Sequence, residues 1–165
     1  MSINFKSDAP LGEILKEFWL SLEEDKGSRA QLRRCKTPEE VVMVSAFHRL
    51  CRRVRPLMKN EHDGWEMRMA AIAGLLAHVR KLESHKTLAE QMAAGDSPAV
   101  SELRFRRLLQ RNRKDLFGAL IRVLGLLDKT ANPFDLAQSV YYWNDKERKR
   151  WAFAYFPNVP EKKSA

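Results

Sequence analysis

Arginines at helical spacing are the residues of this chain whose types and arrangement could do chemistry. Within Ser97–Asp128, Arg104, Arg107 and Arg111 recur at i, i+3 and i+7, so a regular helix would place them on one face. Glu102 projects elsewhere, and no other carboxylate is placed to neutralise that face. Because the planar guanidinium fork suits phosphate oxygens, the pattern predicts a cationic face that binds a polyanion.

The composition of the whole chain also favours a polyanionic partner. Its 165 residues include 30 lysines and arginines against 21 acidic residues, giving a formal net charge of +9. Such an excess indicates nucleic acid as the partner but says nothing about the fold. The length suits one well-buried domain, or two small helical lobes that share a seam, and argues against a two-domain enzyme.

Residues that could catalyse a reaction are sparse. Glu61, His62 and Asp63 contain the only adjacent histidine and acid, which is similar to the metal-binding pair of HD phosphohydrolases. A site of that kind needs a further histidine and a distant aspartate, and the other histidines have no partners at ligand spacing. We therefore expect no enzyme, metal or cofactor, with a metal-dependent nuclease or phosphohydrolase using His62 and Asp63 as a minor alternative.

The periodicity of apolar residues predicts an all-α protein of eight to nine helices in a compact two-lobed bundle. We expect residues 1–10 to be flexible, 11–156 to form a single helical domain with a possible lobe division near 84–97, and 157–165 to be a mobile polar tail. The expected helices are Leu11–Glu24, Arg29–Arg34, Pro38 to Pro56, Trp65–Leu82, Thr87–Ala94, one begun by Ser97 and Pro98, and others after Asn112, Asn132 and Asn144.

The helix that follows Asn112 is expected to be the central one. Its residues from Leu116 to Leu127 are too apolar for a surface helix, and Arg122 is its one charge after Asp115. The tryptophans Trp19, Trp65, Trp143 and Trp151 fall on apolar faces and are expected in the core rather than as platforms for stacked bases.

Cysteine usage and hydropathy give the expected compartment. Cys35 and Cys51 have no CxxC spacing, so we expect reduced packing residues in a cytoplasmic protein. There is no apolar N-terminal run of signal length, and no stretch approaches the roughly 20 apolar residues of a membrane span.

Four stretches, in order, resemble the CasB family, the small subunit of the type I-E Cascade complex of CRISPR immunity. They are GSRAQLRR at 27–34, AFHRL at 46–50, SELRFRRLL at 101–109, and YWND at 142–145 followed by Arg148 and Trp151–Ala152. The resemblance implies an all-helical, non-catalytic subunit present in two copies beside other Cascade subunits. It also implies a basic surface that holds crRNA and single-stranded DNA backbone and stabilises the R-loop.

The resemblance and the cationic face together define the predicted binding residues. By motif, the resemblance implies Arg34, Arg104, Arg107, Arg113, Arg122, Lys146 and Arg148. Arg33 stands beside Arg34, and Arg111 belongs to the cationic face. Arg52 and Arg53 close a helix, where a solvated end matched to the helix dipole is an equal alternative.

A helical DNA-binding regulator is the remaining alternative. It would need a polar recognition helix able to lie in the major groove, and the helix after Asn112 is almost wholly apolar. No membrane or small-molecule partner is expected.

Overall fold

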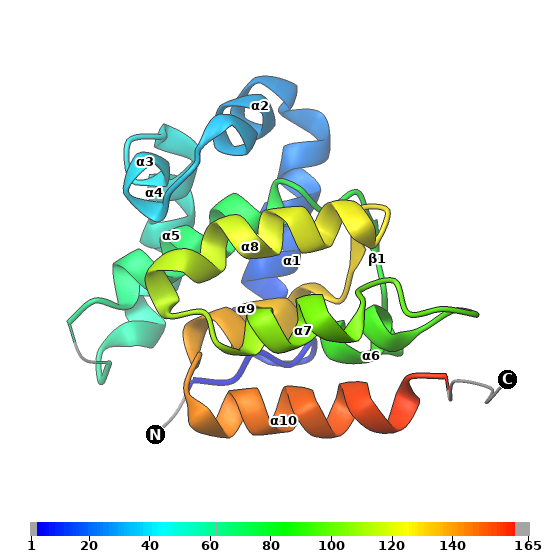
Figure 1. Ribbon diagram of the computed structural model, residues 1–165. Helices are drawn as coiled ribbons and strands as arrows, with labels where there is room; N and C mark the ends of the chain where they lie inside the picture. Colours follow the sequence, from blue (N-terminus) through cyan, green and yellow to red (C-terminus); the bar gives the residue numbers. More distant parts are fainter. Residues whose placement is uncertain (1–2, 62, 161–165) are drawn as a thin grey trace, which may run out of the picture.

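The computed structural model describes residues 3–61 and 63–160, and within them the fold is all-α (Figure 1). It has ten α-helices where the sequence predicted eight to nine, two short 3₁₀-helices and two strands of two residues each. The elements are α1 (Pro10–Glu24), α2 (Lys26–Arg34), α3 (Pro38–Val41), α4 (Ser45–Val54), η1 (Arg55–Met58), α5 (Trp65–Leu76), β1 (Lys81–Leu82), α6 (Leu88–Ala93), α7 (Glu102–Leu109), α8 (Arg113–Leu126), β2 (Thr130–Ala131), α9 (Pro133–Tyr141), α10 (Asp145–Tyr155) and η2 (Phe156–Asn158).

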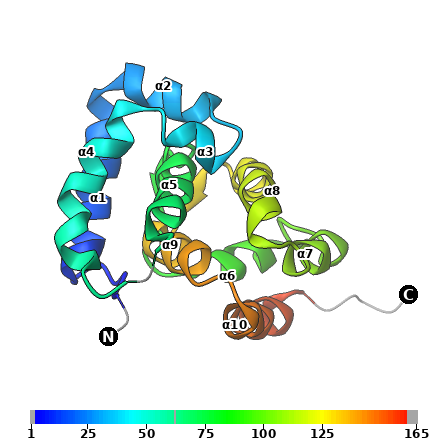
Figure 2. The ribbon, with the colours of Figure 1, turned by 90° about the vertical axis from the view of Figure 1, so that its left-hand side faces the viewer.

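Helix α5 lies at the centre of the molecule. Figure 2 shows α1 and α4 on one side of it and α7 and α8 on the other, with α9 beside it. Trp65 and every residue from Met69 to Leu76 are buried, as expected for a helix that is apolar on all sides from Met69 onward. The prediction that α8 is the central helix is therefore wrong, because α8 leaves Leu126 40% exposed.

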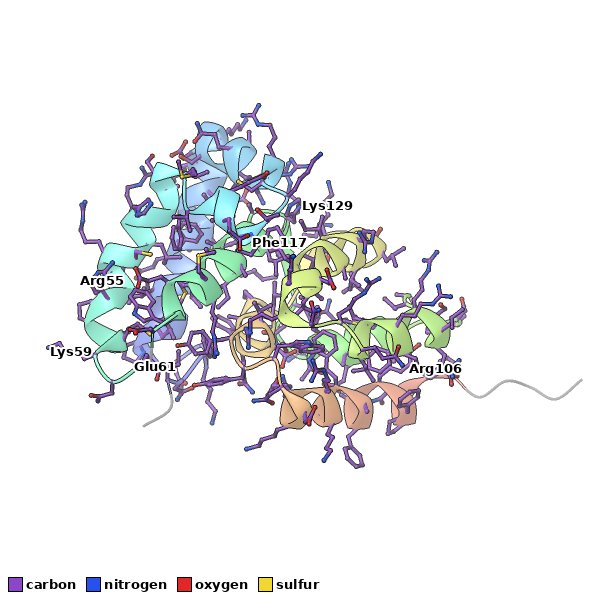
Figure 3. The ribbon with its side chains drawn as sticks, turned by 60° about the vertical axis from the view of Figure 1, so that its left-hand side comes forward. Arg55, Lys59, Glu61, Arg106, Phe117 and Lys129 are labelled. Carbon is purple, nitrogen blue, oxygen red and sulfur yellow. The ribbon has the colours of Figure 1, made fainter. Side chains whose placement is uncertain are left out.

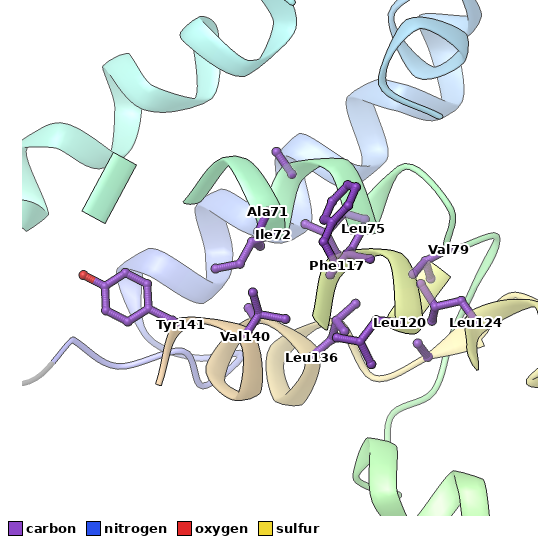
Figure 4. Packing of buried hydrophobic residues seen from close by; sticks show 14 of the residues in the cluster. Ala71, Ile72, Leu75, Val79, Phe117, Leu120, Leu124, Leu136, Val140 and Tyr141 are labelled. Carbon is purple, nitrogen blue, oxygen red and sulfur yellow. The ribbon is translucent and has the colours of Figure 1, made fainter. Parts of the chain in front are cut away.

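A glycine allows the neighbours of α5 to approach closely. A Cβ atom built on Gly74 would lie 2.9 Å from Cγ2 of Val41 in α3 and 2.9 Å from the ring of Phe117 in α8. Figure 4 shows Phe117 against Leu75 in the core that α5, α8 and α9 share. The position of α8 therefore depends on the missing side chain at Gly74.

The predicted helix from Pro38 to Pro56 is wrong in its continuity. The chain leaves the helical conformation at Val44, which is extended with φ −99° and ψ 127°. Three β-branched residues, Val41, Val42 and Val44, fall at this break and have reduced helix propensity. The break allows α3 to pack on α5 while α4 packs on α1.

The predicted helix from Trp65 to Leu82 is too long, because α5 ends at Leu76. Beyond it, the carbonyl of Val79 accepts hydrogen bonds from Trp19 Nε1 at 2.8 Å and Arg29 Nη2 at 2.6 Å. The chain then runs beside residues 129–131, where β1 and β2 pair in parallel. These distant partners, rather than any local breaker, end the helix.

Side-chain caps start most of the other helices where the sequence predicted. Asn112 accepts from the amide of Asp115, Thr87 and Glu90 form a capping box, and Asn132 and Asn144 cap α9 and α10. The predicted start at Ser97 and Pro98 is wrong. Those residues lie in a turn, and Ser101 caps α7.

The two ends of the domain are partly described. Phe5 lies in the core at 2% exposure and packs against Tyr141 and Tyr142, so residues before α1 are attached to the helical body. At the other end, η2 follows α10, and residues 161–165 of the predicted mobile tail lie outside the described residues.

We predict that Gly74→Ala destabilises the fold. The added methyl meets Val41 and Phe117 at 2.9 Å, and overpacking of this kind costs about 1–3 kcal/mol in the free energy of unfolding. Gly125→Ala in α8 is the matched control, because no atom lies within 4 Å of its Cβ position. We expect that control to be neutral or to stabilise by up to about 1 kcal/mol, through the better helix propensity of alanine. Urea unfolding measures both, and equal stability of the two variants would contradict the packing argument.

Candidate nucleic-acid interface

Four of the predicted arginines surround one groove between α7 and α8. Arg104 and Arg107 project from α7, Arg111 follows it, and Arg122 projects from α8. The groove has a volume of about 400 Å³. Helix α7 ends at Leu109, so Arg111 lies in the turn to α8 rather than on a continuous helix as predicted. The turn nevertheless brings its side chain to the same groove.

The groove combines an apolar lining with guanidinium groups. Its other lining residues are apolar: Val100, Leu108, Ala119, Val123 and Leu126. Among the described residues, no carboxylate lines the groove. None of the ion pairs formed anywhere in the described part of the chain involves the four arginines of the groove. The groove therefore offers four cations to an external anion.

Helix α7 is fixed to α10 by aromatic packing. The ring of Phe105 stacks on that of Tyr155 with centroids 3.8 Å apart and an interplanar angle of 7°. Tyr155 also donates a hydrogen bond from its hydroxyl to the carbonyl of Val100 at 2.5 Å, just before α7. Both contacts are buried, so they hold the outer wall of the groove in place.

Arg113, a predicted binding residue, is bonded within the protein. Its Nη1 donates to the carbonyl of Val140 at 2.6 Å, and its Nη2 donates to those of Tyr141 at 3.2 Å and Trp143 at 3.3 Å. Burial, together with the neighbouring charge of Arg68, lowers the pKa of Arg113 to about 10, so it stays protonated at neutral pH. Its donors are directed at the end of α9 rather than at the groove.

Arg148 is also engaged by protein groups. It donates from Nη1 to Asp145 at 3.1 Å and from Nη2 to the carbonyl of Arg111 at 3.1 Å. Its guanidinium carbon lies 5.2 Å from the ring centre of Trp143. Arg148 thus touches the backbone of a groove residue while its own side chain is only 30% exposed.

The other predicted residues lie away from the groove. Arg33 and Arg34 are exposed on α2, Arg52 and Arg53 are exposed on α4, and Lys146 is exposed on α10. Arg53 forms an ion pair with Glu17. Figure 3 shows Arg55, which follows α4, on the opposite side of the molecule from Arg106 of α7. The structure therefore separates the α4 arginines from the α7–α8 groove.

A second basic recess contains residues that the sequence did not single out. Arg33 lines it together with Lys26 and Arg80, beside the Arg29–Glu23 pair, in a volume of about 360 Å³. Arg80 was missed because it was placed inside an overlong helix. Only the pairing of residues 80 and 81 with Lys129 reveals its position.

The structure brings no metal-binding group together in the described residues. No set of three histidine, cysteine or acidic side chains gathers there, and His62 lies outside the described residues. Glu61 accepts a hydrogen bond from the hydroxyl of Tyr141. Burial, with Arg33 and Lys129 nearby, lowers the pKa of His78 to about 4, so it is neutral at neutral pH.

Helix α8 does not present the polar face of a recognition helix. It packs against α5, and Leu116, Phe117 and Leu120 are all buried. The regulator alternative required this helix to be free to enter a DNA groove, and its burial argues against that alternative.

The cysteines and tryptophans lie as predicted. Cys35 and Cys51 are buried free thiols, and burial raises the pKa of Cys51 to about 11. The four tryptophans are at most 7% exposed. None of the described helices has the length and apolar character needed to cross a membrane.

Comparison with known proteins finds one family. Residues 28–156 match the model of the family described as CRISPR-associated protein Cse2. No curated protein matches the chain.

Two solved structures share the fold. A chain in the crystal structure of Escherichia coli Cascade bound to a PAM-containing double-stranded DNA target matches with 24% identity and a TM-score of 0.67. The match covers 88% of this chain and 93% of that one. CasB from Thermus thermophilus matches with 20% identity and a TM-score of 0.65, over 90% of this chain and 98% of its own.

We predict different stability effects for two arginines that the sequence placed in the same site. Arg113→Met removes the donors to three carbonyls and should lower the free energy of unfolding by about 1–3 kcal/mol. Arg104→Met is the control, because Arg104 is exposed like Arg113 but its side chain makes no hydrogen bond to the described residues, and we expect its effect to stay within about 0.5 kcal/mol. Chemical denaturation of both variants tests this. An Arg113 variant as stable as the Arg104 variant would show that the three bonds contribute little.

Proposed function

The chain belongs to the CRISPR-associated Cse2 family, and we propose that it serves as a non-catalytic subunit of a CRISPR Cascade complex in antiviral defence. The family match covers most of the chain, and the E. coli structure that shares its fold is a Cascade complex with a DNA target. The complex would act in the cytoplasm. The partners of this chain within it would be the other Cascade subunits and the crRNA.

The α7–α8 groove is the proposed binding site for nucleic-acid backbone. The observation that carries this proposal is the convergence of Arg104, Arg107, Arg111 and Arg122 on one groove with no carboxylate in its lining. Guanidinium groups bind phosphate oxygens without reading bases, and in RNA-guided complexes base pairing with the guide supplies sequence specificity. The groove would therefore hold the single-stranded backbone of an R-loop regardless of its sequence.

The salt dependence of binding gives this proposal a quantitative form. Each phosphate contact with a single strand releases condensed counterions and contributes about 0.7 to the slope of log K against log salt. Four arginine contacts correspond to a slope of about −2.8, which is measurable by titration at several salt concentrations.

We predict that Arg107→Glu weakens binding to single-stranded DNA of any sequence. Loss of the contact should reduce the salt slope by at least about 0.7, whereas thermal stability should hardly change because Arg107 is exposed. Fluorescence anisotropy with unrelated oligonucleotides measures both affinity and slope.

Arg106→Glu is the matched control for this experiment. Arg106 is exposed on the same helix but does not line the groove, and its reversal changes the net charge by the same amount. Equal losses of DNA affinity in Arg107→Glu and Arg106→Glu would indicate a general charge effect, and the groove would then no longer be proposed as the binding site. A lower melting temperature of Arg107→Glu, with binding intact, would indicate a structural role instead.

We also propose that the complex contains two copies of this chain. Native mass spectrometry of the complex, purified from cells through a tag on this subunit, should give a mass with two copies, other Cascade subunits and a bound crRNA. Recovery of the chain alone would contradict the proposed membership, and a complex with one copy would contradict the stoichiometry.

A further inference from the structure

The turn between α7 and α8 is held by Trp143, in the turn between α9 and α10, and by Arg148 in α10. The carbonyl of Arg111 accepts from Trp143 Nε1 at 2.8 Å and from Arg148 Nη2 at 3.1 Å. In the opposite direction, Arg113 donates to the carbonyls of Val140, Tyr141 and Trp143. Trp143 in the α9–α10 turn and Arg148 in α10 thus donate to the α7–α8 turn, and Arg113 at the start of α8 donates to the end of α9 and to Trp143.

These bonds act where the groove needs support. Helices α7 and α8 touch each other little, because the groove lies between them, and only Gln110–Asn112 join them. The separation of the two arginine-bearing walls is therefore set at this joint and at the packing of each helix on other elements. Arg111, whose side chain lines the groove, is the residue whose backbone is held.

We propose that Trp143, Arg148 and Arg113 form a clamp that positions Arg111 and the two walls of the groove, and that Arg113 and Arg148 are positioning residues rather than phosphate contacts. This inference rests on the proposed function of the groove. Trp143 carries no charge and is 5% exposed, so any effect of Trp143 on phosphate binding must pass through the residues that it holds.

Replacement of Trp143 by phenylalanine isolates that effect. Trp143→Phe keeps an aromatic ring and removes the bond to the Arg111 carbonyl. Trp19→Phe is the matched control, because Trp19 is also buried and donates the same kind of bond, at 2.8 Å, to the carbonyl of Val79. We expect Trp143→Phe to weaken single-stranded DNA binding several-fold and to reduce the salt slope by about 0.7, the share of one phosphate contact. The control should lose stability without a change in slope. The clamp would be overturned if Trp143→Phe had the salt slope of the wild type. It would also be overturned if Trp143→Phe and Trp19→Phe lost the same amount of affinity for single-stranded DNA.

A double-mutant cycle distinguishes the two roles of Arg148. If Arg148 acts through Arg111, then Arg148→Met, Arg111→Gln and the double variant should each reduce the slope by about 0.7, because one contact is lost in every case. A reduction of about 1.4 in the double variant would make Arg148 an independent phosphate contact and overturn its assignment.

Hydrogen exchange tests the clamp without nucleic acid. The amides of Gln110 and Arg111 are bonded to the carbonyls of Arg107 and Leu108. They should exchange faster in Trp143→Phe and Arg148→Met, and at the wild-type rate in Trp19→Phe. Unchanged exchange in all three variants would refute the clamp. If exchange is faster in the first two of these variants but Arg107→Glu and Arg106→Glu bind single-stranded DNA with equal affinity, the clamp is retained and the groove is refuted as the binding site.

Discussion

The close approach of three helices at Gly74 is the constraint on which the rest of the structure depends. Helix α5 has alanines and this glycine where it meets its neighbours, so α3 and α8 can pack directly against it. Interiors are packed as densely as organic crystals, and a shift of one neighbour must be taken up by the others. The inner wall of the basic groove belongs to α8 and is thereby placed by a residue that has no side chain and no charge.

Local signals in the sequence were sufficient to locate most helix starts and the ends of α1, α2 and α6, but not the end of α5 or which helix is most buried. Asn112, Thr87 and Asn132 cap helices through bonds to amides two or three residues away, which a sequence pattern contains. The end of α5 depends on Trp19 and Arg29, 60 and 50 residues away from the carbonyl that they bind. The central position of α5 was also not predicted. Both α5 and α8 contain long apolar runs, and such a run does not show which of the two helices is surrounded by the others.

The candidate site shows the same division between local and distant information. Helical spacing identified Arg104 and Arg107, and the structure places both beside Arg122, which the family motif supplied. Arg113 and Arg148 are indistinguishable from these residues in type and neighbourhood along the chain. They differ because carbonyls 27 to 37 residues away accept their hydrogen bonds, and no spacing rule identifies such partners.

The attachment of α7 to α10 has a consequence for the synthesis of the protein. The outer wall of the groove is fixed by Phe105 against Tyr155 and by the bond from Tyr155 to Val100, about 50 residues earlier in the chain. A nascent chain that has not yet released α10 from the ribosome therefore carries its arginines on a helix that lacks its support. The groove reaches its final form only after α10 has left the ribosome and packed against α7.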